Sequence, residues 1–216
     1  MNKLIIEANN LLRGQGFEYA ICGGYAIDLF LGKETRMHGD IDILAYWKDR
    51  DQIITYMWSQ GFQVFEMLGG GKAHQITDLA DQQKKKRNIF CVYPGCPLVQ
   101  LQKTQETDIY GIVFDHVGQE HLDFIEFLFN DKTETELLYA RNPEVKREID
   151  KSILSAEGIP YLAPEWCLLY KSTDPDRESN QQDYTKAMGK MLSSQKEWLN
   201  HALKIMYPEG HNWTIR

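Results

Sequence analysis

The sequence predicts an α+β protein, with a mixed β-sheet flanked by helices over residues 1–132 and a helical C-terminal domain over residues 133–216. Three observations support this. In the first part, short apolar segments bounded by glycine alternate with segments of helical periodicity. A Gly-Gly turn joins the first expected strand to the second expected helix. In the last third, the apolar residues recur almost entirely at helical spacing.

The individual elements follow from the periodicity of apolar residues and from the turn residues between them. Helices are expected over residues 3–14, 24–32, 49–60, 134–141, 164–171, 179–192 and 194–206. Strands are expected over residues 19–22, 40–46, 62–65, 88–93, 109–114 and 121–129. A hairpin or loop is expected over residues 153–161. The periodicity is weakest over residues 69–112.

The composition is that of a folded globular protein, with 43% hydrophobic and 12% aromatic residues in a chain of 216. The net charge of −7 makes nucleic acid an unlikely main partner, because proteins that hold nucleic acid usually have a basic surface. No apolar run approaches the roughly 20 residues that span a bilayer. The N-terminal residues lack the apolar core of a signal peptide. We therefore expect a cytoplasmic protein with no membrane contact.

Two aspartates are the strongest candidates for a functional site. Asp40 and Asp42 are two residues apart in an expected strand, so they project from the same face. Carboxylate oxygens are the preferred ligands of Mg²⁺, which is often held together with substrate phosphates. Upstream, Gly23 and Gly24 would let the backbone approach a phosphate closely. This pattern predicts a metal-dependent nucleotide site.

A third acid is expected from the apolar segment at residues 121–129. It contains Asp123 and Glu126, and carboxylates rarely lie in such a strand without a partner or a metal. The two are three residues apart, so on a regular strand they face opposite sides. Only one of them is therefore expected to join Asp40 and Asp42, and the residues alone leave the choice open.

This set of residues suits nucleotidyl transfer, in which metal ions bridge a triphosphate and an attacking hydroxyl. A third carboxylate can complete the metal site or accept the proton of the hydroxyl. Arg36 can hold phosphate oxygens through two parallel hydrogen bonds, and His38 can contact them less specifically.

The segments around the Gly-Gly turn and the aspartate pair resemble those of the aminoglycoside and lincosamide nucleotidyltransferases, in the DNA polymerase beta-like nucleotidyltransferase superfamily. The matching residues are Gly-Gly-Tyr-Ala-Ile-Asp at 23–28 and Thr-Arg-Met-His-Gly-Asp-Ile-Asp-Ile at 35–43. The C-terminal segments Tyr-Leu-Ala-Pro-Glu at 161–165 and Asp-Tyr at 183–184 resemble the same family. The resemblance covers residues 1–68 and 120–213.

The resemblance implies a metal site and a base. Asp40 and Asp42 would bind Mg²⁺, and Asp123 would be the third metal ligand and the general base. ATP or another nucleoside triphosphate would be the co-substrate. Glu126 remains the alternative for the third carboxylate.

The resemblance also implies contacts to the nucleotide. Gly23, Gly24, Arg36 and His38 match positions around the triphosphate, and Lys171 matches a lysine near phosphate. The chain departs from the family where Tyr25 follows the second glycine, a position that is usually serine in polymerase-like enzymes. It also lacks the Lys-Asp pair that the family has just before Asp183, so the resemblance implies no role for that helix start.

A third departure concerns the acceptor. Asp123 follows Asp42 by 81 positions, which makes this part long for the family, and the extra length lies in residues 69–112. We expect that segment to help form an acceptor pocket of its own.

The predicted reaction transfers a nucleoside monophosphate, AMP from ATP in the first instance, to a hydroxyl of a small molecule such as an aminoglycoside- or lincosamide-type antibiotic. Modification of RNA or protein is the first alternative, favoured only by the basic run at residues 84–87. A catalytically inactive nucleotide-binding protein is the second. We expect a monomer or a homodimer.

Overall fold

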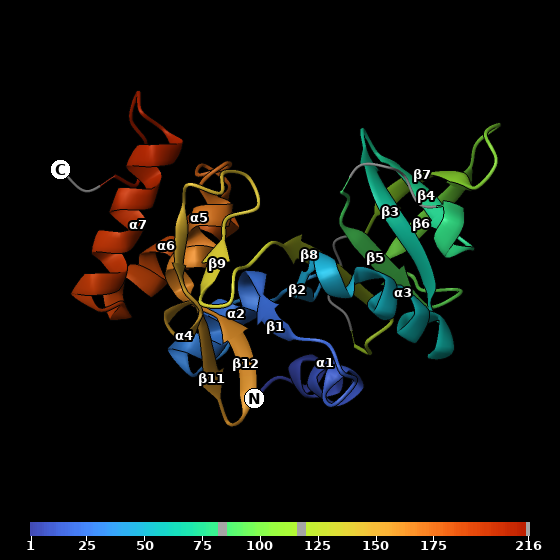
Figure 1. Ribbon diagram of the computed structural model, residues 1–216, viewed down its shortest axis with the longest axis horizontal. Helices are drawn as coiled ribbons and strands as arrows, with labels where there is room; N and C mark the ends of the chain where they lie inside the picture. Colours follow the sequence, from blue (N-terminus) through green and yellow to red (C-terminus); the bar gives the residue numbers. More distant parts are fainter. Residues whose placement is uncertain (82–85, 116–119, 215–216) are drawn as a thin grey trace. The chain divides into compact units, whose positions relative to one another are not determined.

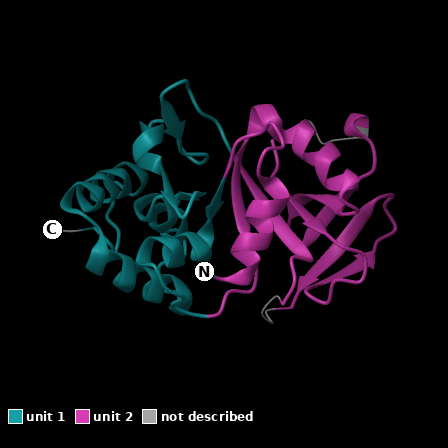
Figure 2. Ribbon diagram, turned by 90° about the horizontal axis from the view of Figure 1, so that it is seen from below, with its two compact units in different colours: residues 1, 20–36, 130–216 teal, residues 2–19, 37–129 magenta. Residues whose placement is uncertain are grey.

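The computed structural model describes residues 1–81, 86–115 and 120–214, which form two compact units (Figure 2). Unit 1 contains residue 1 with residues 20–36 and 130–216, and unit 2 contains residues 2–19 and 37–129. The expected boundary after residue 132 lies close to the point where the chain passes from unit 2 to unit 1. Residues 20–36, however, group with the C-terminal residues. As a division into domains, the boundary at residue 132 stays a prediction.

Two helices of unit 2 lie close to the predicted ranges. They are α1 (Lys3–Leu12) and α3 (Arg50–Ser59), with short 3₁₀ turns at η1 (Trp47–Asp49) and η2 (Leu79–Asp81). The Asn2 side chain caps α1 by accepting a hydrogen bond of 2.9 Å from the amide of Leu4. The apolar stripe of α1 is buried, as its periodicity predicted.

The strands of unit 2 form one hydrogen-bonded series in the order β2-β8-β5-β3-β4-β7-β6 (Figure 1). Their bounds are β2 Asp42–Tyr46, β3 Gln63–Gly69, β4 Lys72–Ile76, β5 Ile89–Val92, β6 Val99–Lys103, β7 Ile109–Phe114 and β8 Phe124–Asn130. The weakly predicted residues 69–112 therefore supply β4 to β7. Three consecutive glycines with positive φ at 69–71 make the turn between β3 and β4.

An aromatic cluster forms part of the core of unit 2. The rings of Phe65 and Phe90 stack with centroids 5.0 Å apart, and Phe124 lies 5.7 Å from Phe90. All three side chains are buried. This cluster holds β8, which carries Glu126 and directly follows Asp123, against the strands that the sequence predicted least clearly.

Unit 1 contains a parallel pair of strands, which makes the sheet arrangement mixed. Strand β1 (Tyr19–Cys22, whose first residue belongs to unit 2) pairs in parallel with β12 (Ile159–Leu162). β12 pairs in antiparallel fashion with β11 (Ile153–Ala156) through a tight turn at Glu157 and Gly158, both with positive φ. The expected hairpin at residues 153–161 is confirmed.

The helices of unit 1 pack together around large apolar side chains. Their bounds are α2 Gly23–Leu31, α4 Ile149–Ser152, α5 Pro164–Lys171, α6 Glu178–Lys190 and α7 Ser193–Met206. Trp166 of α5 is fully buried and its ring lies 4.7 Å from that of Trp198 of α7. The predicted helical C-terminal part is confirmed for α5 to α7. Among the described helices, none is long and apolar enough to cross a membrane.

The helix expected over residues 134–141 is wrong. The chain instead forms β9 (Glu136–Leu138), which pairs in antiparallel fashion with β10 (Lys146–Glu148). Leu137 and Tyr139, two residues apart, are both almost fully buried. This alternation favours a strand, and tertiary burial overrode the helical preference of Glu and Leu.

Candidate functional site

A cluster of three carboxylates is the candidate metal site, and all three belong to unit 2. Asp42 is the first residue of β2, Asp40 precedes it by two residues, and Glu126 lies in β8. One carboxylate oxygen from each residue lies within 4.8 Å of the other two. Among the described residues, this is the group of acids, histidines and cysteines with the geometry to hold a metal ion.

The pairing of β2 with β8 explains how the three acids meet. The backbone amide of Glu126 donates a hydrogen bond of 3.1 Å to the carbonyl of Ile41, which lies between the two aspartates. The Ile41 side chain is fully buried. Asp40 and Asp42 therefore project from the opposite face, since side chains alternate along an extended chain. The Glu126 side chain lies on that same face, beside both of them.

The electrostatics of the cluster favour a bound cation. Burial, followed by the negative charges of Asp42 and Asp40, raises the pKa of Glu126 from 4.5 to about 8. All three causes disfavour the charged carboxylate. A divalent cation would reverse this preference, because its positive charge stabilises the ionised form of all three carboxylates. An oxygen-only donor set of this kind suits Mg²⁺.

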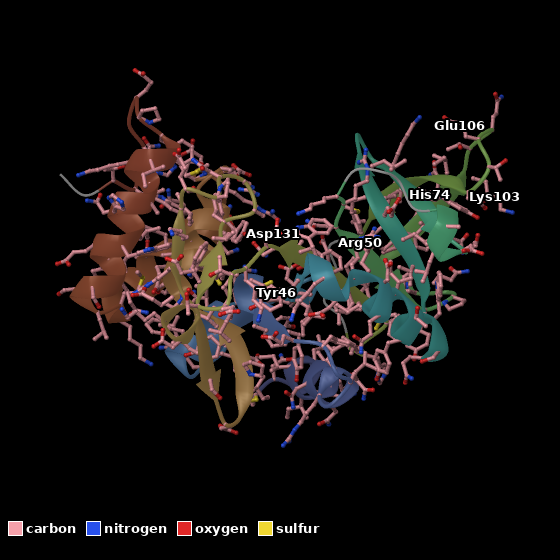
Figure 3. The ribbon with its side chains drawn as sticks, in the orientation of Figure 1. Tyr46, Arg50, His74, Lys103, Glu106 and Asp131 are labelled. Atoms are coloured by element: carbon pink, nitrogen blue, oxygen red, sulfur yellow. The ribbon has the colours of Figure 1, made fainter. Side chains whose placement is uncertain are left out.

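A second carboxylate in unit 2, that of the buried Glu66, has an arginine as its partner. Glu66 of β3 accepts a hydrogen bond of 2.6 Å from Arg50 of α3, and its other oxygen lies 3.3 Å from Nδ1 of His74 of β4. Figure 3 labels Arg50 and His74 on these elements. The charge of Glu66 is thus already balanced by a guanidinium, so this cluster is part of the packing of the unit.

Asp123, the residue first expected to be the third acid, is not part of the cluster. It precedes β8, where its amide bonds to the carbonyl of His121 and its carbonyl accepts from Tyr93, both at 2.9 Å. Glu126 lies three residues further on, at the opposite parity of the strand. The expectation that only one of the two acids joins the aspartate pair agrees with this geometry, and the acid that does so is Glu126.

The two glycines predicted to contact the nucleotide open helix α2 in unit 1. The φ of Gly23 is 64°, a left-handed conformation that side chains other than hydrogen rarely adopt. The Cys22 side chain makes no capping hydrogen bond at this helix start. Backbone N–H groups at such a terminus are suited to an anion. Contact of Gly23 and Gly24 with phosphate stays a prediction.

The loop after α2 is fastened within unit 1 by hydrogen bonds from both sides. The Asp28 carboxylate accepts from the amide and the hydroxyl of Thr35, at 3.0 and 2.7 Å. The Thr35 carbonyl accepts from Lys186 of α6 at 2.8 Å. Arg36 comes next and forms two hydrogen bonds to Asp183 of α6, at 3.1 and 2.9 Å. The guanidinium expected to hold phosphate is therefore engaged by a carboxylate.

Lys171, at the end of α5, approaches the same carboxylate, with its ammonium 3.1 Å from Oδ2 of Asp183. Burial alone would raise the pKa of Asp183. The hydrogen bonds and charges of Arg36 and Lys171 outweigh this and bring the pKa below its ordinary value of 3.8. Asp183 is the residue whose role sequence reasoning missed. It lies 147 positions from Arg36, and no local pattern marked the pair.

The remaining candidates are His38 and the basic run at residues 84–87. His38, expected near the triphosphate, is buried in unit 2 with only 6% of its surface exposed. Lys84 and Lys85 lie outside the described residues. The ammonium of Lys86 lies over the ring of Trp47 at 5.5 Å, and Arg87 donates to the Met67 carbonyl at 3.0 Å. These two described members of the run contact the protein itself.

Comparison with known proteins finds one family profile and several solved structures that resemble this chain. Residues 4–68 match the sequence profile of the family described as aminoglycoside-2''-adenylyltransferase. The solved structure of the lincosamide antibiotic adenylyltransferase LnuA, lincomycin-bound, superposes with a TM-score of 0.54 at 15% identity. The match covers 88% of this chain and 98% of that one. The chain therefore shares its fold with that structure.

Two structures of ANT(2'')-Ia show the same nucleotidyltransferase fold. The complex with adenylyl-2''-tobramycin has a TM-score of 0.53 at 16% identity, over 94% of both chains. The solution structure of this antibiotic-resistance factor has a TM-score of 0.52 at 14% identity, over 95% of this chain and 90% of that one. No curated protein sequence matches the chain. The predicted resemblance to aminoglycoside and lincosamide nucleotidyltransferases is confirmed by the profile match and by the fold.

Proposed function

We propose that the protein is a Mg²⁺-dependent nucleotidyltransferase that transfers a nucleoside monophosphate, AMP from ATP, to a hydroxyl of an aminoglycoside- or lincosamide-type antibiotic. The observation that carries the proposal is the cluster of Asp40, Asp42 and Glu126 within 4.8 Å of one another. The profile match over residues 4–68, which includes both aspartates, supports it. The fold shared with enzymes whose structures contain lincomycin and adenylyl-tobramycin supports the class of acceptor.

In the proposed reaction the acceptor hydroxyl oxygen forms a bond to the α-phosphorus of the triphosphate. The bond from that phosphorus to the oxygen bridging to the β-phosphate breaks, and pyrophosphate leaves. The proton of the hydroxyl would pass to the third carboxylate. Asp40, Asp42 and Glu126 would hold Mg²⁺, which supplies charge stabilisation for the phosphates during the displacement. We assign the third carboxylate to Glu126 in place of Asp123. Gly23, Gly24, His38 and Lys171 are proposed to contact the nucleotide.

The direct test is pyrophosphate release from the purified protein with Mg²⁺, nucleoside triphosphates and a panel of aminoglycosides and lincosamides. Release that depends on one antibiotic supports the proposal, and activity that survives Asp42→Asn would overturn the metal mechanism. Antibiotics that leave the rate unchanged, with nucleotide label appearing on RNA or protein instead, would replace the acceptor class.

A pair of variants tests the assignment of the third acid. Glu126→Gln is expected to lower kcat by roughly 10²- to 10⁴-fold, the range for a group acting directly on the reaction. Asp123→Asn is the matched control, because it removes a carboxylate three residues away and outside the cluster. A larger loss in Asp123→Asn than in Glu126→Gln would return the role to Asp123.

A further inference from the structure

One face of the unit 2 sheet, the Glu126 face, carries aromatic side chains beside the carboxylate cluster. Glu126 of β8 lies directly opposite Phe90 of β5, and Phe90 lies directly opposite Phe65 of β3. Residues that oppose each other in antiparallel strands project from the same face, with their Cβ atoms about 5 Å apart. Phe124 precedes Glu126 by two residues and shares its face. Aromatic side chains therefore border the candidate metal site within unit 2.

The Glu126 face continues over the strands that residues 69–112 supply. Strands β5 and β7 are three places apart in the sheet, which would separate them by about 14 Å if the sheet were flat. The ring of Phe114 of β7 nevertheless lies 6.0 Å from that of Phe90 and 5.6 Å from that of Phe124. The sheet therefore curls, and β7 comes close to the aromatic neighbours of Glu126.

The two faces of this sheet differ in how they are covered. The opposite face carries Glu66, which accepts a hydrogen bond from Arg50 of α3, so α3 lies over that side. On β8, Ile125 and Phe127 of the α3 side are fully buried, whereas Glu126 is half-buried. The Glu126 face is partly covered by the chain after β5, and it keeps a partly exposed apolar surface. The side chains of this surface are Met67, Leu101, Tyr110, Ile112 and Phe114.

The charges on the Glu126 face limit what can bind there. Among the positions that the register of β3 to β8 assigns to this face, the charged residues are Glu126 and Lys103. Lys103 lies opposite Tyr110 in the hairpin of β6 and β7, where Figure 3 labels it. A molecule with several ammonium groups would meet a lysine on these described strands and no acid beyond that of the metal site. A hydrocarbon or ring surface would instead meet apolar partners.

We propose that the Glu126 face binds the apolar part of the acceptor, and that Ile112 and Phe114 determine acceptor specificity. Phe114 contacts both aromatic neighbours of Glu126, so one molecule can place its hydroxyl at the carboxylates and its apolar part on β7. The acceptor is then a hydroxylated molecule with a hydrocarbon or ring surface and few positive charges. Of the two proposed classes, this chemistry is that of a lincosamide-type antibiotic. The proposal rests on the proposed function for the reaction.

The experiment compares lincomycin, which has a hydrocarbon-bearing ring and a single amine, with tobramycin, which has several. Binding of each is measured by calorimetry with Mg²⁺ and a non-hydrolysable ATP analogue, and kcat and KM are measured in pyrophosphate release. The wild type should bind lincomycin and prefer it over tobramycin by roughly tenfold or more in kcat/KM, the range for an apolar contact in a pocket.

Two neighbouring residues of β7 provide a matched pair of variants. Ile112 and Val113 are both β-branched and face opposite sides of the sheet, and Val113 is 49% exposed. Ile112→Ala should weaken lincomycin binding by roughly tenfold, because apolar area is lost from the contact. Phe114→Ala should weaken it by at least as much, and Val113→Ala should bind as the wild type does.

The KM values separate specificity from a structural role. Ile112→Ala should raise the KM for lincomycin and leave the KM for ATP unchanged. A purely structural role would lower the folded fraction seen by circular dichroism, without changing the affinity of the folded molecules for lincomycin. If Phe114→Ala does not fold, Ile112→Ala and its control carry the test.

The outcomes distinguish this proposal from the proposed function. Lincomycin that binds more weakly to Ile112→Ala than to Val113→Ala, without any pyrophosphate release, supports the specificity proposal and counts against the proposed function. Transfer to tobramycin with no preference for lincomycin overturns the specificity proposal and supports the proposed function. Equal lincomycin binding by Ile112→Ala and Val113→Ala also overturns the specificity proposal. A wild type that binds neither antibiotic overturns both.

Discussion

Replacing Glu126 with glutamine tests the carboxylate cluster without any substrate. In the metal-free protein the pKa of Glu126 is about 8, against about 4.5 for an ordinary glutamate. The folded state therefore binds more protons than the unfolded state between these two values. The wild type should lose stability as pH rises from about 5 to 8, and the loss should be complete above pH 8. The neutral amide of Glu126→Gln removes this dependence.

Burial is the largest cause of the raised pKa of Glu126, and repulsion by Asp42 and Asp40 adds to it. The distance between the carboxylates gives the size of the repulsion. Two unit charges 4.8 Å apart repel by about 0.9 kcal/mol in water and by about 3.5 kcal/mol at the effective dielectric constant of a protein surface. Asp40 is exposed and Glu126 is half-buried, so a repulsion between these two limits applies. Relative to wild type, Glu126→Gln should gain about 1 to 3 kcal/mol on going from pH 5 to pH 9. For a chain of this length, each kcal/mol corresponds to roughly 2–4 °C in Tm.

The assay is thermal unfolding with a chelator present, at pH 5 and pH 9, for wild type and Glu126→Gln. Asp123→Asn is the control for the loss of a carboxylate from the same segment, and it should show no comparable gain. A Tm difference between wild type and Glu126→Gln that is equal at the two pH values would refute the reasoning. So would a variant that is less stable than wild type at pH 9.

Three further predictions concern metal binding, a buried ion pair and the turn before α2. Mg²⁺ at ten times its Kd should stabilise the wild type by about 1.4 kcal/mol in a thermal-shift assay. Asp42→Asn should show no such shift, and an equal shift in that variant would place the metal elsewhere. Arg147→Met should lower the free energy of unfolding in urea by roughly 3–5 kcal/mol, because it leaves the fully buried Glu165 without its cation; a loss below about 1 kcal/mol would contradict this. Gly23→Ala should lower it by roughly 1–2 kcal/mol, since φ is 64° there, and an unchanged urea midpoint would show that the turn adapts.

The local pattern of the sequence was sufficient for most helices and for the aspartate pair. Helix α1 is determined by an asparagine cap and an apolar stripe, both of which are local features. The two-residue spacing of Asp40 and Asp42 places their side chains on one face of any extended chain. The spacing of Asp123 and Glu126 likewise showed that only one of them could join the pair. These conclusions depend on backbone geometry, which is the same in every fold.

Other features depend on which segments of the chain become neighbours, and only the tertiary structure determined these. The register between β2 and β8, with the Glu126 amide on the Ile41 carbonyl, brings Glu126 beside Asp40 and Asp42. The burial of Leu137 against the rest of unit 1 turned a segment with helical preference into a strand.

The pairing of Arg36 with Asp183 is the clearest example of a feature that the sequence alone did not predict. The sequence by itself determined that a cation follows α2 and that an acid lies on α6. Their contact across 147 residues exists only because α2 and α6 pack together in unit 1. The role of a charged side chain depends on its counter-ion. When the two residues are far apart in the sequence, the packing of the helices determines which residue the counter-ion is.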